Sequence, residues 1–351
     1  MSRRTLASIL VACLLVVLCG AAAVLPVPYV TMSPGPTLNV LGRTKGRPII
    51  AVSGHRTYPA RGELRLTTVS VTNPGRHIGL GEALQAWFDK SRAVYPRDVI
   101  YPPDQTAAQS EQQSNVEMVS SQDTAIAAAL AELGYRLPLQ IEVLAVTKGS
   151  PADGRLVVRD RIEQINGIQI RDVTQVSRTI QKTGVGESAT FVVRRGAATK
   201  RVVVKAKPSP DDPKRAVVGV QIGTGYDFPF DVSVRLGEDI GGPSAGLMFS
   251  LGVYDRLTPG SLTGGTDIAG TGTIDEHGHV GPIGGIEQKI VAARDAGAKI
   301  FFVPPGNCGS ALHADVRKDE IELVKAPTMH SAVSSLNAYV KNHHAALPAC
   351  R

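Results

Sequence analysis

The feature that most constrains this chain is an uncharged, apolar stretch at residues 6–27, which follows a basic start with two arginines. It is long enough to cross a bilayer, since a spanning helix needs about 20 apolar residues. No Lys or Arg follows until Arg43, so charge bias predicts that residues 1–5 are cytoplasmic and the rest is extracytoplasmic. We expect an uncleaved, single-pass anchor, because the run exceeds a usual signal core. The alternative is a protein secreted after signal cleavage near the alanines at 21–23.

The composition of the whole chain is that of a folded protein. Its 351 residues, 43 % hydrophobic and 20 % charged, leave room for two domains. The net charge is +7, but the basic residues are scattered along the chain and have no aromatic residues interleaved with them. This pattern argues against nucleic-acid binding. Cys308 and Cys350 lie in the exported part, where a disulfide and two free thiols are both open. Both a monomer and a homo-oligomer are compatible with the sequence.

The first part of the exported body is predicted to be β-rich and then helical. Residues 28–46 are expected to form a linker, because Pro-Gly-Pro occupies 34–36. Residues 47–134 then form a folded segment that includes a loop or flap. Its expected elements are strands at 48–52 and 63–71, a helix at 80–93, the polar loop or flap at 95–113, and a helix from 117 to near 134.

Residues 135–207 are predicted to form a separate small domain. Its expected elements are strands at 139–146, 161–165, 188–194 and 201–205, a turn at 166–167 and a helix at 172–183. This order, and above all the run from Gly149 to Gly167, resembles a PDZ domain. Arg159 stands where that family often has glycine.

A PDZ groove lies between a strand and the main helix, and it binds a peptide as an added strand whose carboxylate meets loop N–H groups. The resemblance implies a carboxylate loop at 135–139, which includes Leu137 and Leu139. It also implies a helix wall formed by Val173, Val176 and Ile180. Simple packing in the domain core is the alternative interpretation for these side chains.

Residues 208–345 are predicted to form an α/β segment that contains a serine and a lysine suited to covalent catalysis. Ser244 lies in the turn Gly-Gly-Pro-Ser-Ala-Gly at 241–246, which opens an apolar helix and places the hydroxyl near unpaired N–H groups. Lys289 follows Gly284-Gly285 at the start of another apolar helix. Burial and the positive end of the helix dipole would lower the pKa of its amine, as a general base requires.

These two motifs, with Pro-Ile-Gly-Gly at 282–285, resemble the proteolytic domain of Lon-type serine peptidases. The resemblance implies Ser244 as nucleophile, Lys289 as base and Thr271 as a hydroxyl that hydrogen-bonds near the lysine. It extends to the segment before the PDZ-like domain, so residues 47–134 and 208–345 would be two parts of one split domain. The expected fold class is therefore α+β multidomain: a Lon-type α/β proteolytic domain with an inserted PDZ domain, preceded by one transmembrane helix.

Two differences from the Lon family affect the polarity near the dyad, since Gly241 replaces a common Asp and Gln288 a common Glu. The larger difference is a missing ATPase: no Gly-x-x-x-x-Gly-Lys-Ser/Thr phosphate loop occurs, so no ATP and no other cofactor is expected. His277 and His279 flank a glycine beside Asp275. They are expected at a polar hairpin tip rather than in a metal site.

The expected function is an ATP-independent, membrane-anchored serine endopeptidase that cleaves extended segments of extracytoplasmic proteins, with the PDZ domain binding peptide tails. The amides of Gly242 and Ala245 are the nearest oxyanion donors by position. A penicillin-binding acyltransferase is excluded, because it needs Ser-x-x-Lys and the third residue after Ser244 is Leu247. The remaining alternative is a catalytically inert PDZ scaffold or chaperone-like adaptor at the membrane surface.

Overall fold

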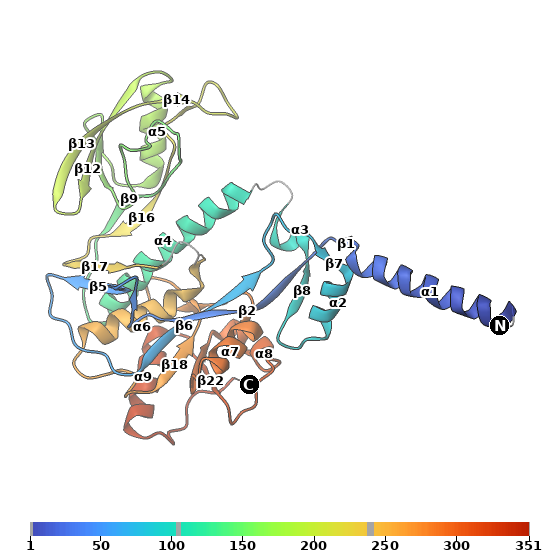
Figure 1. The fold of residues 1–351 in the computed structure, drawn as a ribbon. Helices are drawn as coiled ribbons and strands as arrows, with labels where there is room; N and C mark the ends of the chain where they lie inside the picture. Colours follow the sequence, from blue (N-terminus) through green and yellow to red (C-terminus); the bar gives the residue numbers. More distant parts are fainter. Residues whose placement is uncertain (1–2, 103–106, 237–241, 351) are drawn as a thin grey trace.

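The computed structural model describes residues 3–102, 107–236 and 242–350. It contains three parts: a long N-terminal helix, an α/β domain, and a small β-rich domain (Figure 1). The helix leaves the α/β domain on one side, while the small domain lies on another side of it.

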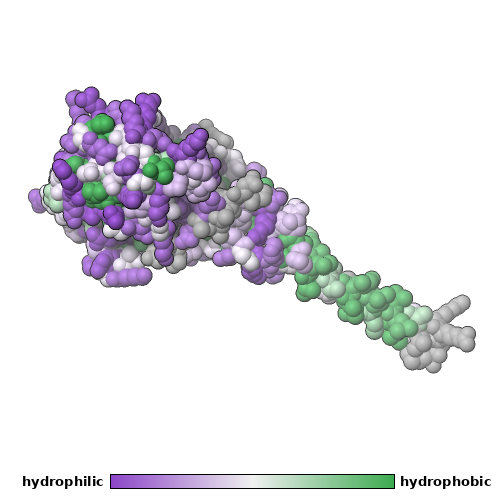
Figure 2. All heavy atoms as spheres, turned by 90° about the horizontal axis from the view of Figure 1, so that it is seen from above, coloured by the Kyte–Doolittle hydropathy of each residue, from purple (hydrophilic) through white to green (hydrophobic). Residues whose placement is uncertain are grey.

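Helix α1 (Arg3–Val24) contains an 18-residue apolar segment, Ala7–Val24, with a mean hydropathy of 2.7. None of this segment is buried against the rest of the protein. Figure 2 shows it as a hydrophobic extension of a largely hydrophilic body. The predicted range 6–27 was wrong at its end, because β1 (Pro26–Val27) is a strand that pairs with β7 (Ile78–Gly79). Proline lacks an N–H group and disfavours helical backbone in the residue before it, which explains why the helix stops.

The predicted linker at 28–46 was also wrong, because this segment contains the long strand β2 (Tyr29–Asn39). The Pro-Gly-Pro sequence lies where the pairing of β2 with its neighbour shifts register, between Pro34 and Thr37. Proline is tolerated at such an irregularity because the ladder hydrogen bonds are interrupted there. A β-carbon at Gly35 would lie 2.4 Å from Thr68 Oγ1, so the close strand approach requires glycine.

A six-stranded sheet forms the centre of the α/β domain and joins its two sequence parts. Strand β6 (Glu63–Val71), at its predicted position, pairs antiparallel with β2 and parallel with β18 (Asp267–Gly270). The two sequence parts also meet where β5 (Ile50–Ser53) pairs antiparallel with β17 (Asp231–Val234). The sheet order is β22 (Glu322–Lys325), β21 (Ile300–Val303), β18, β6, β2 and β8 (Ala93–Pro96).

The helices differ from prediction mainly around the expected flap. Instead of a loop at 95–113, the described residues contain the end of β8, then α3 (Arg97–Ile100), and α4 (Ala107–Glu132) starts well before the predicted position. Residues 103–106 of the predicted flap lie outside the described residues. The first turns of α4 are polar and mostly exposed, so they have no apolar periodicity that would reveal a helix. The predicted helix 80–93 is shorter, as α2 (Leu80–Phe88).

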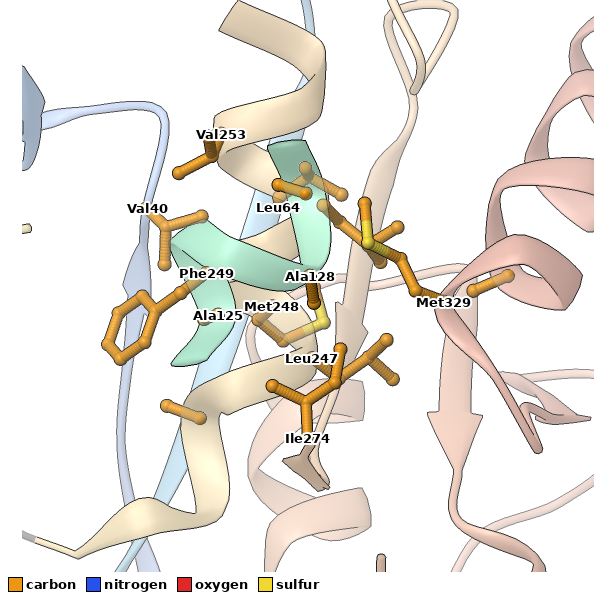
Figure 3. Close-up of a cluster of buried hydrophobic side chains, with 14 of the residues drawn as sticks. Val40, Leu64, Ala125, Ala128, Leu247, Met248, Phe249, Val253, Ile274 and Met329 are labelled. Atoms are coloured by element: carbon orange, nitrogen blue, oxygen red, sulfur yellow. The ribbon is translucent and has the colours of Figure 1, made fainter. Parts of the chain in front are cut away.

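The main core lies between the sheet and two crossing helices, α4 and α6 (Gly246–Leu257) (Figure 3). Ala125 and Ala128 of α4 are small enough to let α6 approach closely, and Leu247, Met248 and Phe249 fill the space around them. Close packing of this kind fixes the position of the helix that begins directly after Ser244.

The small domain extends beyond its predicted end at residue 207. Its sheet order is β13 (Ala198–Lys205), β12 (Ser188–Arg195), β10 (Arg161–Ile165), β9 (Leu139–Val146) and β16 (Val220–Tyr226). Strand β16 pairs with β9 along its whole length, and Ala216 and Val218 belong to the same apolar core. The polar segment after residue 208, predicted as the start of the α/β segment, is a chain reversal flanked by β14 (Lys207–Pro208) and β15 (Ala216–Val217). Helix α5 (Val173–Thr183), capped by Asp172, covers this sheet.

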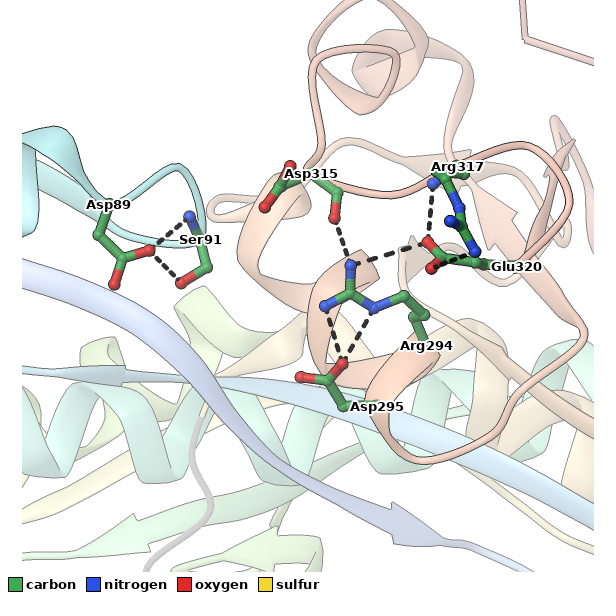
Figure 4. A network of polar contacts seen from close by, with 7 residues as sticks. All are labelled: Asp89, Ser91, Arg294, Asp295, Asp315, Arg317 and Glu320. Atoms are coloured by element: carbon green, nitrogen blue, oxygen red, sulfur yellow. Dashed lines mark hydrogen bonds and ion pairs between the residues drawn. The ribbon is translucent and has the colours of Figure 1, made fainter.

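The C-terminal segment stays attached to the α/β domain up to residue 350, beyond the predicted end at 345. Cys308 and Cys350 form a disulfide, which decides between the bridge and the two free thiols. Lys325 N–H donates to the Pro348 carbonyl at 2.7 Å. Arg294, at the end of α7 (Ile286–Asp295), contacts Asp295 and the Asp315 carbonyl, and it lies 3.8 Å from Glu320 (Figure 4). This polar network ties α7 to the loop before β22.

Candidate active site

Ser244 lies in a tight turn, η1 (Pro243–Ala245), that leads directly into α6. The Ser244 carbonyl accepts hydrogen bonds from the Gly272 amide at 2.8 Å and from Thr271 Oγ1 at 2.9 Å. On the other side, Ser121 Oγ of α4 donates to the Pro243 carbonyl at 3.0 Å. A β-carbon at Gly246 would lie 2.9 Å from Ile274 Cγ2, so only glycine lets the turn lie this close to the next strand. The serine is therefore held by its backbone on both sides.

Lys289 lies in the first turn of α7, on the face that packs against the sheet. The helix begins after Gly285, which has a left-handed φ of 67°. A β-carbon at Gly285 would lie 2.8 Å from Met32 Sδ and 2.7 Å from Val69 Cγ1, so glycine permits α7 to pack on β2 and β6. Lys289 is only 3 % exposed, with Ile290 buried beside it.

The two side chains meet at hydrogen-bond distance. Lys289 Nζ lies 2.8 Å from Ser244 Oγ and 3.2 Å from Thr271 Oγ1. Burial lowers the pKa of the Lys289 amine from 10.5 to about 8, because removal from water disfavours the ammonium. With that pKa, roughly a quarter of the amine is neutral near pH 7.5. A neutral amine at this distance can accept the serine proton, which is the arrangement of an activated nucleophile.

Comparisons with known proteins agree with these two domain resemblances. A family model described as the Lon protease (S16) C-terminal proteolytic domain matches residues 238–335, and a PDZ domain model matches residues 142–195. The chain contains a Lon-type proteolytic domain and a PDZ domain. Ser244 and Lys289 lie in the part matched by the Lon model, and α5 lies in the part matched by the PDZ model.

The similar curated proteins are Lon proteases of several bacteria. Lon protease of Campylobacter concisus is 32 % identical over 143 residues, which cover 40 % of this chain and 17 % of that protein. Lon protease 2 of Bacillus subtilis is 30 % identical over 110 residues, 31 % of this chain and 19 % of that protein. The chain therefore spans less than a fifth of the length of these relatives.

Among solved structures, the PDZ domain of the SdrC-like protein from Listeria monocytogenes is similar to part of this chain. It is 18 % identical with a TM-score of 0.22, and the match covers 24 % of this chain and 86 % of that chain.

The structure places the other predicted residues of the Lon-type site at the same turn. Gly242, with a φ of 90°, precedes η1, and Ala245 ends it. Their role as oxyanion donors stays a prediction. Gly241 lies outside the described residues. Sequence reasoning missed Ser121, which lies on a helix more than a hundred residues away in the chain and has no local signal for contact with the serine turn.

A cleft of about 280 Å³ adjoins the serine turn. It is lined by Pro243 of the turn, by Ser121 and Val116 of α4, by Ile274, and by Leu144 of the PDZ domain. Both domains thus contribute apolar and hydroxyl groups to one cleft next to Pro243 of the serine turn.

The PDZ groove differs from its predicted position. A cavity of about 310 Å³ lies between α5 and β16, and Val176 and Ile180 form its helix side as expected. The strand side is formed by Val220 and Ile222 of β16. The loop at the closed end is 215–219 rather than 135–139.

The residues predicted for the carboxylate loop do not line this cavity, because Leu137 packs against the main core of the Lon-type domain and Leu139, which is 67 % exposed, starts β9. Val173 packs at the edge of the PDZ core and does not line the groove. Gln181 of α5 fixes the loop 215–219 that lines the cavity. Its side-chain amide exchanges hydrogen bonds of 3.1 and 3.3 Å with the backbone of Ala216.

His277 and His279 lie at the tip of a hairpin between β19 (Thr273–Ile274) and β20 (Val280–Gly281), as predicted. Asp275 accepts from the His277 and His279 amides and contacts His279 Nδ1 at 2.8 Å, which stabilises the turn. In the parts of the chain that the structure describes, no group of three His, Cys, Asp or Glu side chains is placed to hold a metal ion.

Proposed function

We propose that this protein is an ATP-independent serine endopeptidase that uses Ser244 and Lys289 as a catalytic dyad. The observation that supports it best is the 2.8 Å contact between Ser244 Oγ and a buried Lys289 amine with a pKa lowered to about 8. Burial of a lysine without a charged partner costs free energy. A purely structural role does not explain why Lys289 is buried beside a hydroxyl, whereas a role as general base does.

In the proposed mechanism, neutral Lys289 accepts the hydroxyl proton while Ser244 Oγ attacks the scissile carbonyl carbon. The negative charge on the carbonyl oxygen is met by backbone N–H groups of the turn, with those of Gly242 and Ala245 as candidates. Protonated Lys289 then gives its proton to the leaving amine, which departs and leaves an acyl-serine. Water, deprotonated by Lys289, hydrolyses the ester and frees the new carboxylate.

Thr271 has a positioning role in this proposal. Its hydroxyl donates to the Ser244 carbonyl and lies 3.2 Å from Lys289 Nζ, so its oxygen can accept from the ammonium that forms after proton transfer. One hydroxyl thereby holds the serine backbone and stabilises the protonated lysine.

The proposed substrates are extended or loosened protein segments, because the chain lacks the phosphate loop of an unfolding ATPase. The PDZ groove between α5 and β16 would bind an apolar peptide tail as an added strand. Leu144 of the PDZ domain lines the cleft next to the serine turn, so a chain that enters this cleft would contact both domains.

We further propose that α1 anchors the protein in a membrane and that both domains lie outside the cytoplasm. The 18-residue apolar segment of α1 supports the anchor, and two arginines before it support the orientation. The Cys308–Cys350 disulfide supports an oxidising compartment.

The test is cleavage of an unfolded protein and a peptide panel by the purified full chain in detergent without ATP. Ser244→Ala and Lys289→Ala are each expected to lower the rate at least a thousandfold, whereas Ser310→Ala, an exposed serine on α8 (Cys308–Ala311), leaves it unchanged. Cleavage by the dyad variants at the parental rate would refute the site. A parent that binds C-terminal peptides and cleaves nothing would favour the scaffold.

A further inference from the structure

Helix α2 has an apolar face that nothing in the described chain covers. Its Ala83 and Ala86 are buried against the body, whereas Leu84, Trp87 and Phe88 are 50 %, 70 % and 82 % exposed. Residues three and four positions apart lie on one face of a helix, so these three side chains form a single stripe. A helix that is apolar on both sides needs a second apolar environment, and clustered exposed aromatics mark an interaction surface.

The start of α2 is fixed directly to the end of α1. Strand β1 pairs with β7, which runs into α2, and the Leu80 amide donates to the Leu25 carbonyl at 3.0 Å. The backbones also touch: a β-carbon at Gly79 would lie 2.7 Å from the Ala23 oxygen. Leu25 follows the last residue of α1 and Leu80 is the first of α2, so α2 begins at the level where α1 ends.

The direction of α2 suits a membrane surface. Figure 1 shows α2 running across the direction of α1 at the point where α1 meets the body. A helix that lies across a spanning helix runs along the bilayer surface. Its far end is held by Asp89, whose Oδ1 accepts from the Ser91 amide at 2.9 Å and from the Ser91 hydroxyl at 2.6 Å (Figure 4). The stripe therefore belongs to a fixed element.

We propose that the stripe of Leu84, Trp87 and Phe88 inserts into the interfacial layer of the bilayer that holds α1, as a second membrane contact. This inference rests on the proposed membrane anchor. The bilayer is the occupant because the stripe continues the exposed apolar surface at the end of α1, where Val24 is 76 % and Leu25 57 % exposed. Tryptophan is enriched at the headgroup level. A helix in the interface plane carries Trp, Phe and Leu on the face that enters the bilayer.

The second contact would limit how the body tilts. A single spanning helix leaves the attached domains free to rotate over the surface. Because α2 packs on β2 and β8, its insertion would hold the central sheet, and with it the dyad, in one orientation to the membrane.

The chain offers a direct probe, because Trp87 is its single tryptophan. The full chain is reconstituted in phosphatidylcholine vesicles that contain either unbrominated lipid or lipid brominated near the headgroup end or near the methyl end of the acyl chain. We expect stronger quenching of Trp87 fluorescence by the shallow bromines than by the deep ones. We also expect at least a threefold lower quenching constant for aqueous iodide than for free tryptophan.

Vesicle flotation in the same samples separates this proposal from the anchor. A chain that floats with vesicles while iodide quenches Trp87 freely and bromine does not would overturn the second contact and keep the anchor. Protection from iodide without bromine quenching means that a second copy or another protein covers the stripe, and it overturns the proposal as well. A chain that does not float refutes both.

The matched variants keep the tryptophan as reporter. Leu84→Ser combined with Phe88→Ser should weaken bromine quenching at least twofold and shift the emission to longer wavelength, with the thermal unfolding of the body retained because both side chains are exposed. Leu312→Ser, an equally exposed leucine elsewhere on the body, should leave the quenching unchanged. Equal quenching in the double variant and the parent would contradict the role of the stripe.

Discussion

At the scale of single residues, Lys289 combines two properties that oppose each other. Its amine is buried beside Ser244 Oγ, which makes it a suitable base near neutral pH. The same burial makes its protonated form unfavourable in the folded protein. Activity and stability should therefore respond to this residue in opposite directions.

The first prediction concerns the pH dependence of cleavage. Since the proposed mechanism needs neutral Lys289, kcat/KM should rise about tenfold per pH unit below 8 and level off above it, following the lowered pKa. Initial rates with a short peptide between pH 6 and 10 would measure this. A profile that is flat from pH 6 to 8 would rule out Lys289 as the base, and Lys289→Arg should show no cleavage at any pH in the range.

The second prediction concerns stability. The folded pKa of Lys289 lies below its unfolded value of 10.5, so its contribution to stability is complete above 10.5 and is lost as the pH falls to about 8. Below pH 8, burial of the protonated Lys289 amine costs roughly 3 kcal/mol of folding free energy, because its pKa is lowered from 10.5 to about 8. Lys289→Met should therefore abolish cleavage and raise the free energy of unfolding by about 1–3 kcal/mol at pH 7. Denaturant unfolding would measure it, and a gain that persists unchanged at pH 11 would contradict the explanation.

At the scale of elements, the serine turn depends on the close contact between η1, α4 and the strand after Thr271. A β-carbon at Gly246 would meet Ile274 Cγ2 at 2.9 Å and Ile274 N at 3.0 Å. We predict that Gly246→Ala costs about 2 kcal/mol of stability, as overpacked sites do, and lowers kcat at least tenfold because the turn shifts. Thermal unfolding and cleavage rates measure the two effects. Gly309→Ala, which meets nothing within 4 Å, should change neither.

The groove of the PDZ domain gives a prediction at the same scale. Ile222 of β16 lines the groove and is only partly buried, so Ile222→Ser should weaken binding of a peptide with an apolar C-terminus about tenfold without unfolding the domain. Fluorescence anisotropy of a labelled peptide would show this. Val203→Ser, exposed on β13 away from the groove, is the control. If both variants bind as the parent does, the peptide lies elsewhere.

Several elements could be predicted from sequence because their signals are local. Alternating β-branched residues mark β6 and β9 at their full lengths, and glycines with a proline mark the turns of Ser244 and Lys289. The errors came from remote partners. Proline in β2 indicated a linker because the irregular pairing that tolerates it involves residues far along the chain. Likewise, no local pattern says which loop lies at the end of the groove beside α5, so the carboxylate loop was predicted at 135–139 and not at 215–219.

At the scale of the whole molecule, the two domains meet through buried charges. Asp123 of α4 accepts from Arg159 of the PDZ domain at 2.7 Å, and the buried carboxyl of Glu142 on β9 lies close to Asp123. Arg159 takes a left-handed φ of 71°, so the position where the PDZ family often has glycine instead supplies an interdomain contact. Burial, with the neighbouring Asp123 charge, raises the pKa of Glu142 to about 8.

The last prediction follows from that carboxyl. A folded pKa raised above the unfolded 4.5 gives stability that is complete below pH 4.5 and is lost as the pH rises through 8. Glu142→Gln should therefore nearly match the parent near pH 5 and exceed its free energy of unfolding by about 2–4 kcal/mol near pH 8.5. Denaturant unfolding at both pH values measures it. An equal difference at both would show that Glu142 does not titrate with folding.

The insertion of the PDZ domain also sets an order of folding. Strands β5 and β6 leave the ribosome early, but their partners β17 and β18 follow only after the whole PDZ sequence has been made. Contacts so distant in sequence form slowly. The PDZ domain has a core of its own, so it can fold as soon as its own sequence is complete, while the segment before it waits with unpaired strand edges. During biogenesis, residues 29–134 are thus the part of this protein most in need of chaperone protection.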